Sequence, residues 1–331
     1  MAHTSILEVP VTQSSNREGW FVLGGILGLL SLGLLLLKVS LNPSPSIPTS
    51  SDLPAIVASD KKSPETERHY AIICSGFTKT NQHAKWFGNS SSQIYKVLKE
   101  QYGYSDESIY FLFDDPKRPL PNEPVVVDGQ MNLENFRKVI HHLESIVTPA
   151  DNVSLFMIGH GIYRNADSWF DCIGKDLSST EFADQIDRLN TKNIHIVLSP
   201  CQMEGFIWRA SKKGRVILSS TRFTENNSAA VAEAAIRGFS NMKYDSNGDG
   251  RLSFAEAYQS MVIEQTQWYA KKGWRQREHA LLDDNGDGMG HYLPTELDSG
   301  DGALAEVTFL GNHGKKIAFV PEQDERLKAQ N

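Results

Sequence analysis

Residues 152–205 decide the fold, and they read NVSLFMIGHGIYRNADSWFDCIGKDLSSTEFADQIDRLNTKNIHIVLSPCQMEG. Two short apolar runs, 153–158 and 194–198, are rich in β-branched and aliphatic residues and predict buried strands. Between them, residues 179–189 carry apolar residues at helical spacing. The resulting order of strand, helix and strand is typical of a parallel sheet.

Each predicted strand leads into a residue that can carry chemistry. His160 follows the first strand and Cys201 the second, and reactive groups collect just beyond the carboxyl ends of parallel strands. A thiol beside an imidazole can be activated as a nucleophile, and the imidazole can protonate the amine that leaves when an amide bond breaks. The N–H groups of Gly161 and Cys201 can form an oxyanion hole. The alternative is a buried apolar cysteine and a histidine bonded within a turn.

Three segments upstream extend this pattern. Residues 69–76 (HYAIICSG) form another apolar run, residues 81–84 (NQHA) open a helical stretch, and residues 103–115 (GYSDESIYFLFDD) hold a strand that ends in two aspartates. With the histidine before the cysteine, residues 68–240 resemble the caspase-like cysteine peptidases, and among them the legumain and glycosylphosphatidylinositol-transamidase family. The resemblance implies a caspase-like three-layer α/β/α sandwich with a mostly parallel sheet.

The resemblance also implies roles for single residues. His160 matches the catalytic histidine, Cys201 the nucleophile and Gly161 an oxyanion-hole donor. Where the family has an arginine of the asparagine-binding pocket this chain has Gln82, and where it has an acidic residue two positions before the cysteine this chain has Ser199. These departures argue against asparaginyl specificity. The candidate pocket residues are Asn81, which lies near the family's third active-site position, Gln82, Ser199, Ser220 and Glu225.

A second signal lies in residues 245–256, DSNGDGRLSFAE, which fit the twelve-residue EF-hand loop. Helical spacing over 229–239 and 254–269 predicts flanking helices. The sequence therefore predicts calcium as a cofactor, although a polar Asp/Gly turn that binds nothing is the alternative. The predicted ligands are Asp245, Asn247, Asp249, the carbonyl of Arg251, Ser253 and Glu256.

Residues 283–288, DDNGDG, repeat the opening of that loop. The twelfth position here is Pro294, so a complete EF-hand is excluded. A truncated calcium turn and a plain turn both fit this sequence. The ligands of a second metal would be Asp283, Asn285 and Asp287.

Residues 20–37 are apolar without a break, and this length is just sufficient for a membrane-spanning helix. We predict a single-pass anchor with the catalytic part on the exported side. The alternative is a secretory signal, but Lys38 follows at once and no small-x-small cleavage site is present. The polar tail 1–19 precedes the anchor, and the Ser/Pro-rich residues 38–67 read as a linker.

The remaining chain divides into a catalytic domain at 68–240, a calcium-binding region at 241–300 and a C-terminal extension at 301–331. The formal net charge of −7 argues against nucleic acid as a partner. The prediction is a membrane-anchored, calcium-binding cysteine endopeptidase that acts on peptide or protein substrates through an acyl-enzyme. The alternatives are a transpeptidase or transamidase of the same family, or an EF-hand scaffold without activity.

Overall fold

A computed structural model describes residues 67–121, 124–226 and 234–311, which belong to one compact unit. The predicted tail, anchor and nearly all of the linker lie outside these residues. Within the described ranges, no helix is long and apolar enough to cross a membrane.

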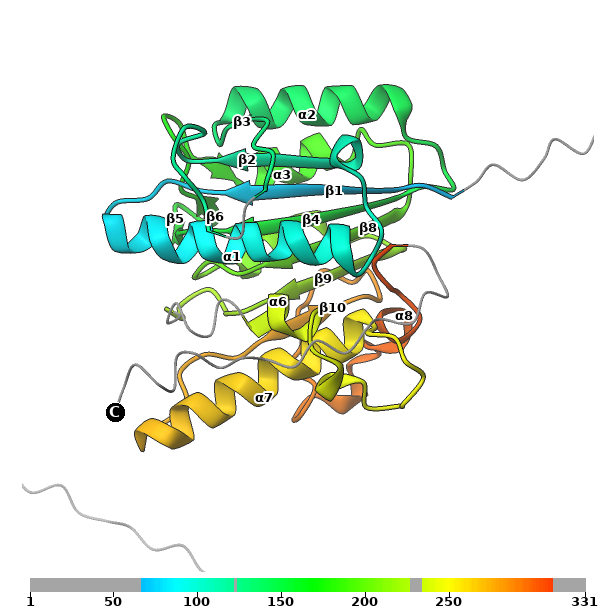
Figure 1. Ribbon diagram of the computed structural model, residues 1–331. Helices are drawn as coiled ribbons and strands as arrows, with labels where there is room; N and C mark the ends of the chain where they lie inside the picture. The colour runs from blue at the N-terminus through cyan, green and yellow to red at the C-terminus, as the bar shows by residue number, and fades with distance from the viewer. Residues whose placement is uncertain (1–66, 122–123, 227–233, 312–331) are drawn as a thin grey trace, which may run out of the picture. The chain divides into compact units, whose positions relative to one another are not determined.

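A central seven-stranded sheet organises the described chain (Figure 1). All neighbouring strands pair in parallel except the edge strand β10, which is antiparallel to β9. Every residue of β4 is buried, as expected for an apolar run covered on both faces. In spatial order the strands are β10 (Leu281–Asp283), β9 (Arg215–Ser219), β8 (Asn193–Leu198), β4 (Asn152–Ile158), β1 (His69–Ser75), β2 (Ile109–Phe113) and β3 (Gly129–Gln130).

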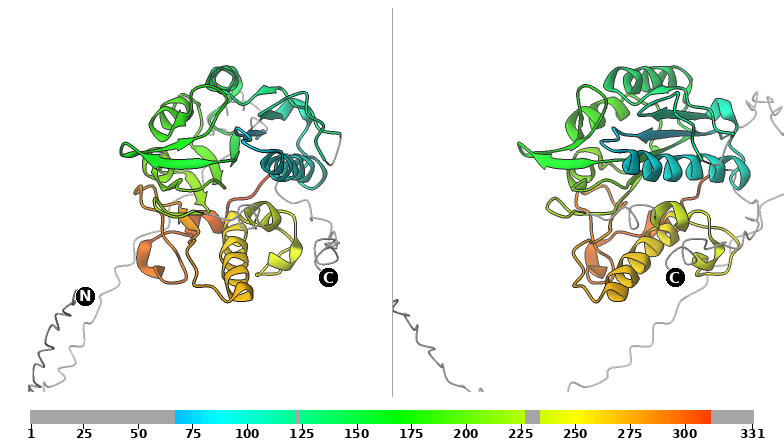
Figure 2. Two further views of the ribbon diagram at one scale, coloured as in Figure 1. Left: turned by 90° about the vertical axis from the view of Figure 1, so that its left-hand side faces the viewer. Right: turned by 60° about the vertical axis from the view of Figure 1, so that its left-hand side comes forward.

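Helices cover both faces of this sheet, as the turned views in Figure 2 show. Ile73 of β1 belongs to one core with α1 (Asn81–Glu100), α6 (Ala234–Gly238) and α7 (Phe254–Lys272). Ile72, which points to the opposite face, belongs to the other core. This second core contains α2 (Leu133–Ile146), α3 (Ser179–Ile186) and α4 (Glu204–Ala210).

A second, three-stranded antiparallel sheet follows β4 and consists of β5 (Gly161–Arg164), β6 (Asp167–Phe170) and β7 (Leu177–Ser178). Its hairpin turns at Asn165 and Ala166, both of which have positive φ. Two successive residues of this kind match the twist of the strands they join.

The remaining elements are short. They are α8 (Ala303–Glu306) and three 3₁₀ turns at Asp106–Ser108, Met242–Tyr244 and Leu297–Ser299. The prediction of a mixed α/β fold with a mostly parallel sheet is confirmed. The predicted catalytic region and the predicted calcium-binding region share the central sheet, because β10 extends it beside β9.

Candidate active site

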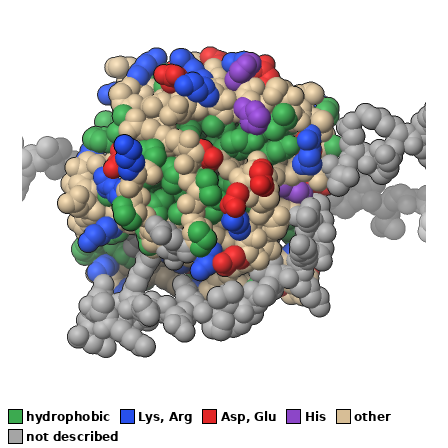
Figure 3. Space-filling view, turned by 45° about the horizontal axis from the view of Figure 1, so that its top comes forward, with side chains coloured by type: hydrophobic (Ala, Val, Ile, Leu, Met, Phe, Trp, Pro, Cys, Tyr) green, Lys and Arg blue, Asp and Glu red, His purple; other side chains and the backbone are tan. Residues whose placement is uncertain are grey.

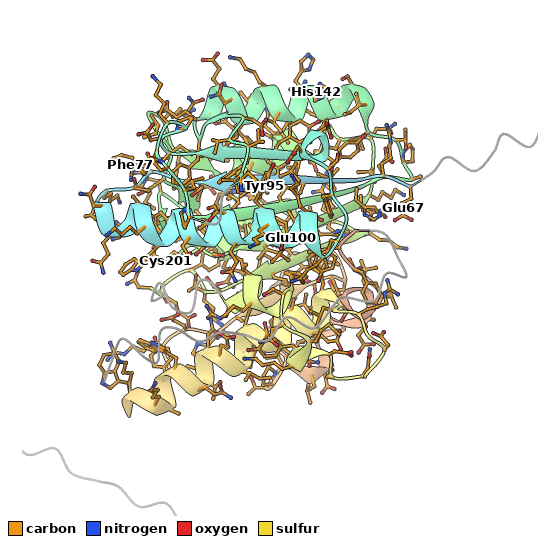
Figure 4. All side chains as sticks on the ribbon, viewed as in Figure 1. Glu67, Phe77, Tyr95, Glu100, His142 and Cys201 are labelled. Carbon is orange, nitrogen blue, oxygen red and sulfur yellow. The ribbon has the colours of Figure 1, made fainter. Side chains whose placement is uncertain are left out.

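The two predicted catalytic residues come together at the carboxyl edge of the sheet. Strands β4 and β8 are hydrogen-bonded neighbours, with Met157 opposite Leu198, so the segments that follow them emerge side by side. His160 and Cys201 line the same cavity of about 580 Å³, and both are partly exposed. Figure 4 labels Cys201 at the edge where β1 and the strands parallel to it end.

Gly161 packs directly against the cysteine segment. A Cβ atom at this position would overlap the carbonyl oxygen of Cys201 and would lie 2.8 Å from Sδ of Met203. Only glycine therefore allows the backbone of residue 161 to approach Cys201 this closely.

Substituting Gly161 by alanine is accordingly expected to displace the cysteine segment. We expect a loss of about 1–3 kcal/mol in the free energy of unfolding, as for an overpacked core, and a fall in thiol-dependent activity. Chemical denaturation and active-site labelling measure the two effects. Gly129→Ala on β3 serves as the control, because its φ is not positive and the nearest atom to a Cβ built there, Nδ2 of the Asn135 side chain, is 3.3 Å away. Wild-type labelling of Gly161→Ala would contradict this assignment.

The backbone after Cys201 is held in an unusual conformation. Gln202 has a φ of +58°, which a non-glycine residue rarely adopts. Its N–H donates to Oγ1 of Thr221 at 2.8 Å, and its Oε1 accepts the N–H of Tyr163 at 2.7 Å. These bonds tie the cysteine turn to the segment after β9 and to β5, which follows His160.

His160 contacts a second histidine that the sequence analysis did not single out. Nε2 of His160 lies 2.9 Å from Nδ1 of His83, and the ring centroids are 4.4 Å apart in an edge-on arrangement. His83 sits in the first turn of α1, where its N–H donates to the capping Thr80. Phe87, one turn later, contacts both imidazoles. His83 is the histidine of the NQHA segment, so the sequence does contain it. The sequence analysis placed Asn81 of this segment, and not His83, near the third active-site position.

The environment of His160 favours its neutral form. Burial lowers its pKa to about 4, and the charges of His83 and Lys79 act in the same direction, whereas Asp171 opposes them. Lys79 is itself paired with Asp171 at 2.6 Å. At neutral pH His160 is therefore an uncharged base that can accept a proton from a thiol.

The other two cysteines are not placed for reaction. Cys74 and Cys172 are buried, and neither forms a disulfide. Burial raises the pKa of Cys172 to about 12 and raises that of Cys74 further. Both therefore remain thiols at neutral pH, and both are buried, whereas Cys201 is partly exposed.

The five predicted pocket residues lie outside the cavity that holds Cys201. Ser199 and Ser220 are buried, and the Ser220 hydroxyl donates to the carbonyl of Ser199 at 2.9 Å, so it supports the cysteine segment instead. Asn81 and Gln82 are exposed on the first turn of α1, and Glu225 lines a different cavity. The cavity is lined, besides His160, Gly161 and Cys201, by Phe77, Lys79, Ile162, Arg164, Asp171, Cys172, Ile173, Gly174, Asp176 and Asn226.

The predicted calcium loop, 245–256, lies before α7. The carboxylate of Asp245 accepts the N–H of Gly250 at 2.9 Å, and that of Glu256 accepts the N–H of Ser253 at 2.9 Å. The oxygen donors of the loop suit Ca²⁺ chemically, since three of its six predicted ligands are carboxylates. In the described ranges no group of three or more His, Cys, Asp or Glu side chains is arranged to hold a metal. Calcium binding therefore stays a prediction.

The second Asp/Asn/Gly stretch forms a compact turn after β10. Asp283 accepts the N–H of Gly286, and Asn285 accepts that of Asp287 at 2.8 Å. The neighbouring Asp301 accepts the N–H of Asp284 at 2.9 Å. These bonds are those of an Asp/Asn turn, and a metal at this position likewise stays a prediction.

Among the solved structures that the chain resembles are one from Geobacter sulfurreducens and one from Spodoptera frugiperda. No protein-family model and no curated protein matches the chain. A crystal structure of a protein from Geobacter sulfurreducens is 10% identical, with a TM-score of 0.40, over 65% of this chain and 92% of that one. Caspase-1 from Spodoptera frugiperda is 12% identical, with a TM-score of 0.41, over 66% of this chain and 87% of that one. The described chain itself is a mixed α/β protein with a thiol and an imidazole in one cavity at the carboxyl edge of its sheet.

Proposed function

We propose that this protein is a cysteine peptidase with a caspase-like fold. The observation that carries the proposal is that His160 and Cys201 emerge from neighbouring parallel strands and line one cavity. The resemblance of the surrounding segments to the legumain family points to the same reaction. A thiol and a neutral imidazole in one accessible cavity are the groups that amide cleavage through an acyl-enzyme requires.

The proposed reaction starts when His160 accepts the proton of the Cys201 thiol. The sulfur attacks the peptide carbonyl, and the N–H groups of Gly161 and Cys201 stabilise the oxyanion. His160 then gives its proton to the leaving amine, the C–N bond breaks, and a thioester remains on Cys201. Water hydrolyses the thioester, with His160 again accepting and returning a proton.

His83 fits this scheme as the partner of His160. A neutral imidazole has one N–H and one bare nitrogen. The tautomer of His160 that is protonated on Nε2 can donate to Nδ1 of His83, 2.9 Å away, and keeps its own Nδ1 available for the thiol proton. When His83 accepts this hydrogen bond, it favours the His160 tautomer whose bare nitrogen is Nδ1.

A peptidyl probe with a thiol-reactive group, together with a positional peptide library, tests the function on the full chain. The proposal expects labelling at Cys201 and cleavage after a restricted set of residues. Transfer of the acyl group to an added amine in place of water would identify a transpeptidase. If the chain is not labelled and cuts no peptide, the peptidase proposal is wrong, and the alternative of a scaffold without activity holds.

We also propose that residues 245–256 bind calcium through the oxygen ligands named above. At calcium concentrations about a hundred times the dissociation constant, the folded state gains about 2.7 kcal/mol. We expect this stabilisation to disappear in Glu256→Gln and to persist in Glu134→Gln, which alters an exposed glutamate on α2. Thermal unfolding with calcium and with a chelator measures the effect. An identical transition of the wild-type protein in both conditions would refute calcium binding.

For the location of the protein we propose a single-pass anchor at 20–37, with the catalytic part on the exported side. Its support is the unbroken apolar run of the sequence. Fractionation of cells that express the full chain tests the anchor, since recovery in the soluble fraction contradicts it.

A further inference from the structure

A second cavity of about 830 Å³ lies between the C-terminal end of α7 and the segment that follows β9. Its wall includes Trp268 of α7 and the residues just beyond this helix, among them Trp274, Arg275 and Arg277. Gly273 ends the helix in the left-handed conformation and turns the chain into this wall.

This second cavity adjoins the catalytic cavity. Asn226 lines both of them. Its Oδ1 accepts from Nε2 of Gln202, the residue next to Cys201, at 3.0 Å. In Figure 1 the C-terminal end of α7 lies on the side of the molecule where the parallel strands end, and Figure 4 labels Cys201 on that side. A peptide held at Cys201 can therefore extend past Asn226 into the second cavity.

The second cavity is lined by two arginines and two glutamates, and only the arginines are exposed. Its two acidic side chains are engaged within the protein, since Glu225 pairs with His279 at 2.6 Å and Glu278 accepts from the Tyr269 hydroxyl at 2.7 Å. Arg275 and Arg277 are exposed, and they form no ion pair in the described part of the chain. Residues 271–277, KKGWRQR, hold four cationic and no anionic side chains in a chain whose net charge is −7.

The aromatic residues provide a surface for a peptide. Trp274 is 61% exposed, and its ring meets that of Trp268 edge-on at 5.7 Å. Figure 3 shows that the surface carries hydrophobic and basic groups elsewhere too, so the distinguishing feature here is the shared wall with the catalytic cavity. An exposed aromatic beside two arginines can pack against a peptide backbone while the arginines bind a carboxylate.

We propose that the second cavity is a substrate subsite that binds an acidic side chain of the peptide, a few residues from the bond that Cys201 attacks. Arg275 and Arg277 bind the carboxylate, and Trp274 packs on the neighbouring peptide. This assignment rests on the proposed peptidase function. It names a substrate class, peptides with an acidic residue near the scissile bond, which the sequence alone does not indicate.

Cleavage of paired peptides tests the subsite. The peptides differ only by Glu or Lys at one position at a time on both sides of the scissile bond. We expect glutamate to raise kcat/KM about tenfold at one position, as for one charge-assisted contact. The double variant Arg275→Glu/Arg277→Glu should reverse the preference. The control Lys96→Glu/Lys138→Glu makes the same charge change at exposed lysines of α1 and α2, and it should retain the wild-type preference.

A binding measurement separates this inference from the peptidase proposal. Full-length Cys201→Ala is titrated with the glutamate and lysine peptides by fluorescence anisotropy, and with vesicles rich in phosphatidylserine. Tighter binding of glutamate peptides that is lost in Arg275→Glu/Arg277→Glu supports the subsite even if no peptide is cut. Equal affinity for both peptides, or binding to the vesicles alone, overturns it. Absence of Cys201 labelling in the wild-type chain contradicts the peptidase function instead.

Discussion

Replacement of Cys201 by alanine is expected to abolish peptide cleavage, with a loss of about 10⁴-fold or more in kcat. The physical reason is that the proposed thioester needs an accessible thiol, and the other cysteine that lines the cavity, Cys172, is buried. His160 activates a nucleophile but does not replace it, and the remaining cysteines of the chain are buried. Cleavage of the preferred library peptide, followed by mass spectrometry of the products, measures the effect.

The control for this variant is Cys172→Ala. Cys172 also lines the catalytic cavity, but it is buried and its pKa is raised to about 12. We expect this change to lower stability and to leave labelling of Cys201 in place. If the Cys201→Ala protein cut peptides at the wild-type rate, the thiol mechanism would be wrong.

Loss of either histidine of the pair is expected to reduce cleavage to different extents. His160→Ala should lower kcat by about 10²–10⁴-fold, the usual contribution of a general acid–base group. His83→Ala should lower it less, because it removes only the partner of Nε2. His83→Asn should recover part of the activity, since its amide oxygen can accept the same N–H. His142→Ala, on the outer helix α2 (Figure 4), is the control. Equal rates for wild type and His83→Ala would exclude the proposed role of His83.

The pH dependence follows from the same pair. Because burial lowers the pKa of His160 to about 4, the base should stay uncharged well below its ordinary value of 6.5. The acid limb of kcat/KM should therefore lie near pH 4, and it should move upward in His83→Ala, which removes one cause of the lowered pKa.

The lowered pKa of His160 also makes the free energy of unfolding depend on pH. The contribution of His160 to stability is intact above pH 6.5 and is lost as pH falls to about 4. Unfolding of wild type and His160→Gln across this range measures that loss.

The sequence predicted the strands and helices of the central sheet where the pattern was long and unambiguous. Runs such as 153–158 can be buried on both faces only in an inner strand, and the helical spacing at 179–189 corresponds to α3. The hairpin of β5 and β6 could not be predicted from the sequence pattern. Its turn consists of Asn165 and Ala166, both with positive φ, and alanine rarely adopts this conformation, so its side chain does not indicate a turn of this kind.

The candidate site was predicted to the extent that it depends on strand ends. His160, Gly161 and Cys201 could be placed because each follows an apolar run. His83 could not be distinguished from Asn81, because their spacing from the strand is similar and only the packing of α1 brings one of them to His160. Ser220 looked like a pocket residue, yet its hydroxyl is used within the protein. Contacts between segments that are far apart in the sequence cannot be predicted from the local pattern of apolar and polar residues.

The strand order also has a consequence for synthesis of the protein. The bond from Arg68 to Asp151 at the start of the β1–β4 pairing spans 83 residues. The cysteine turn is tied further to Thr221, after β9. Long-range parallel pairing forms slowly, and a ribosome adds about 5–20 residues per second. A nascent chain therefore lacks the hydrogen bond from Gln202 to Thr221 until β9 and the residue pair after it have been synthesised, so products truncated before residue 221 lack this support of the cysteine turn.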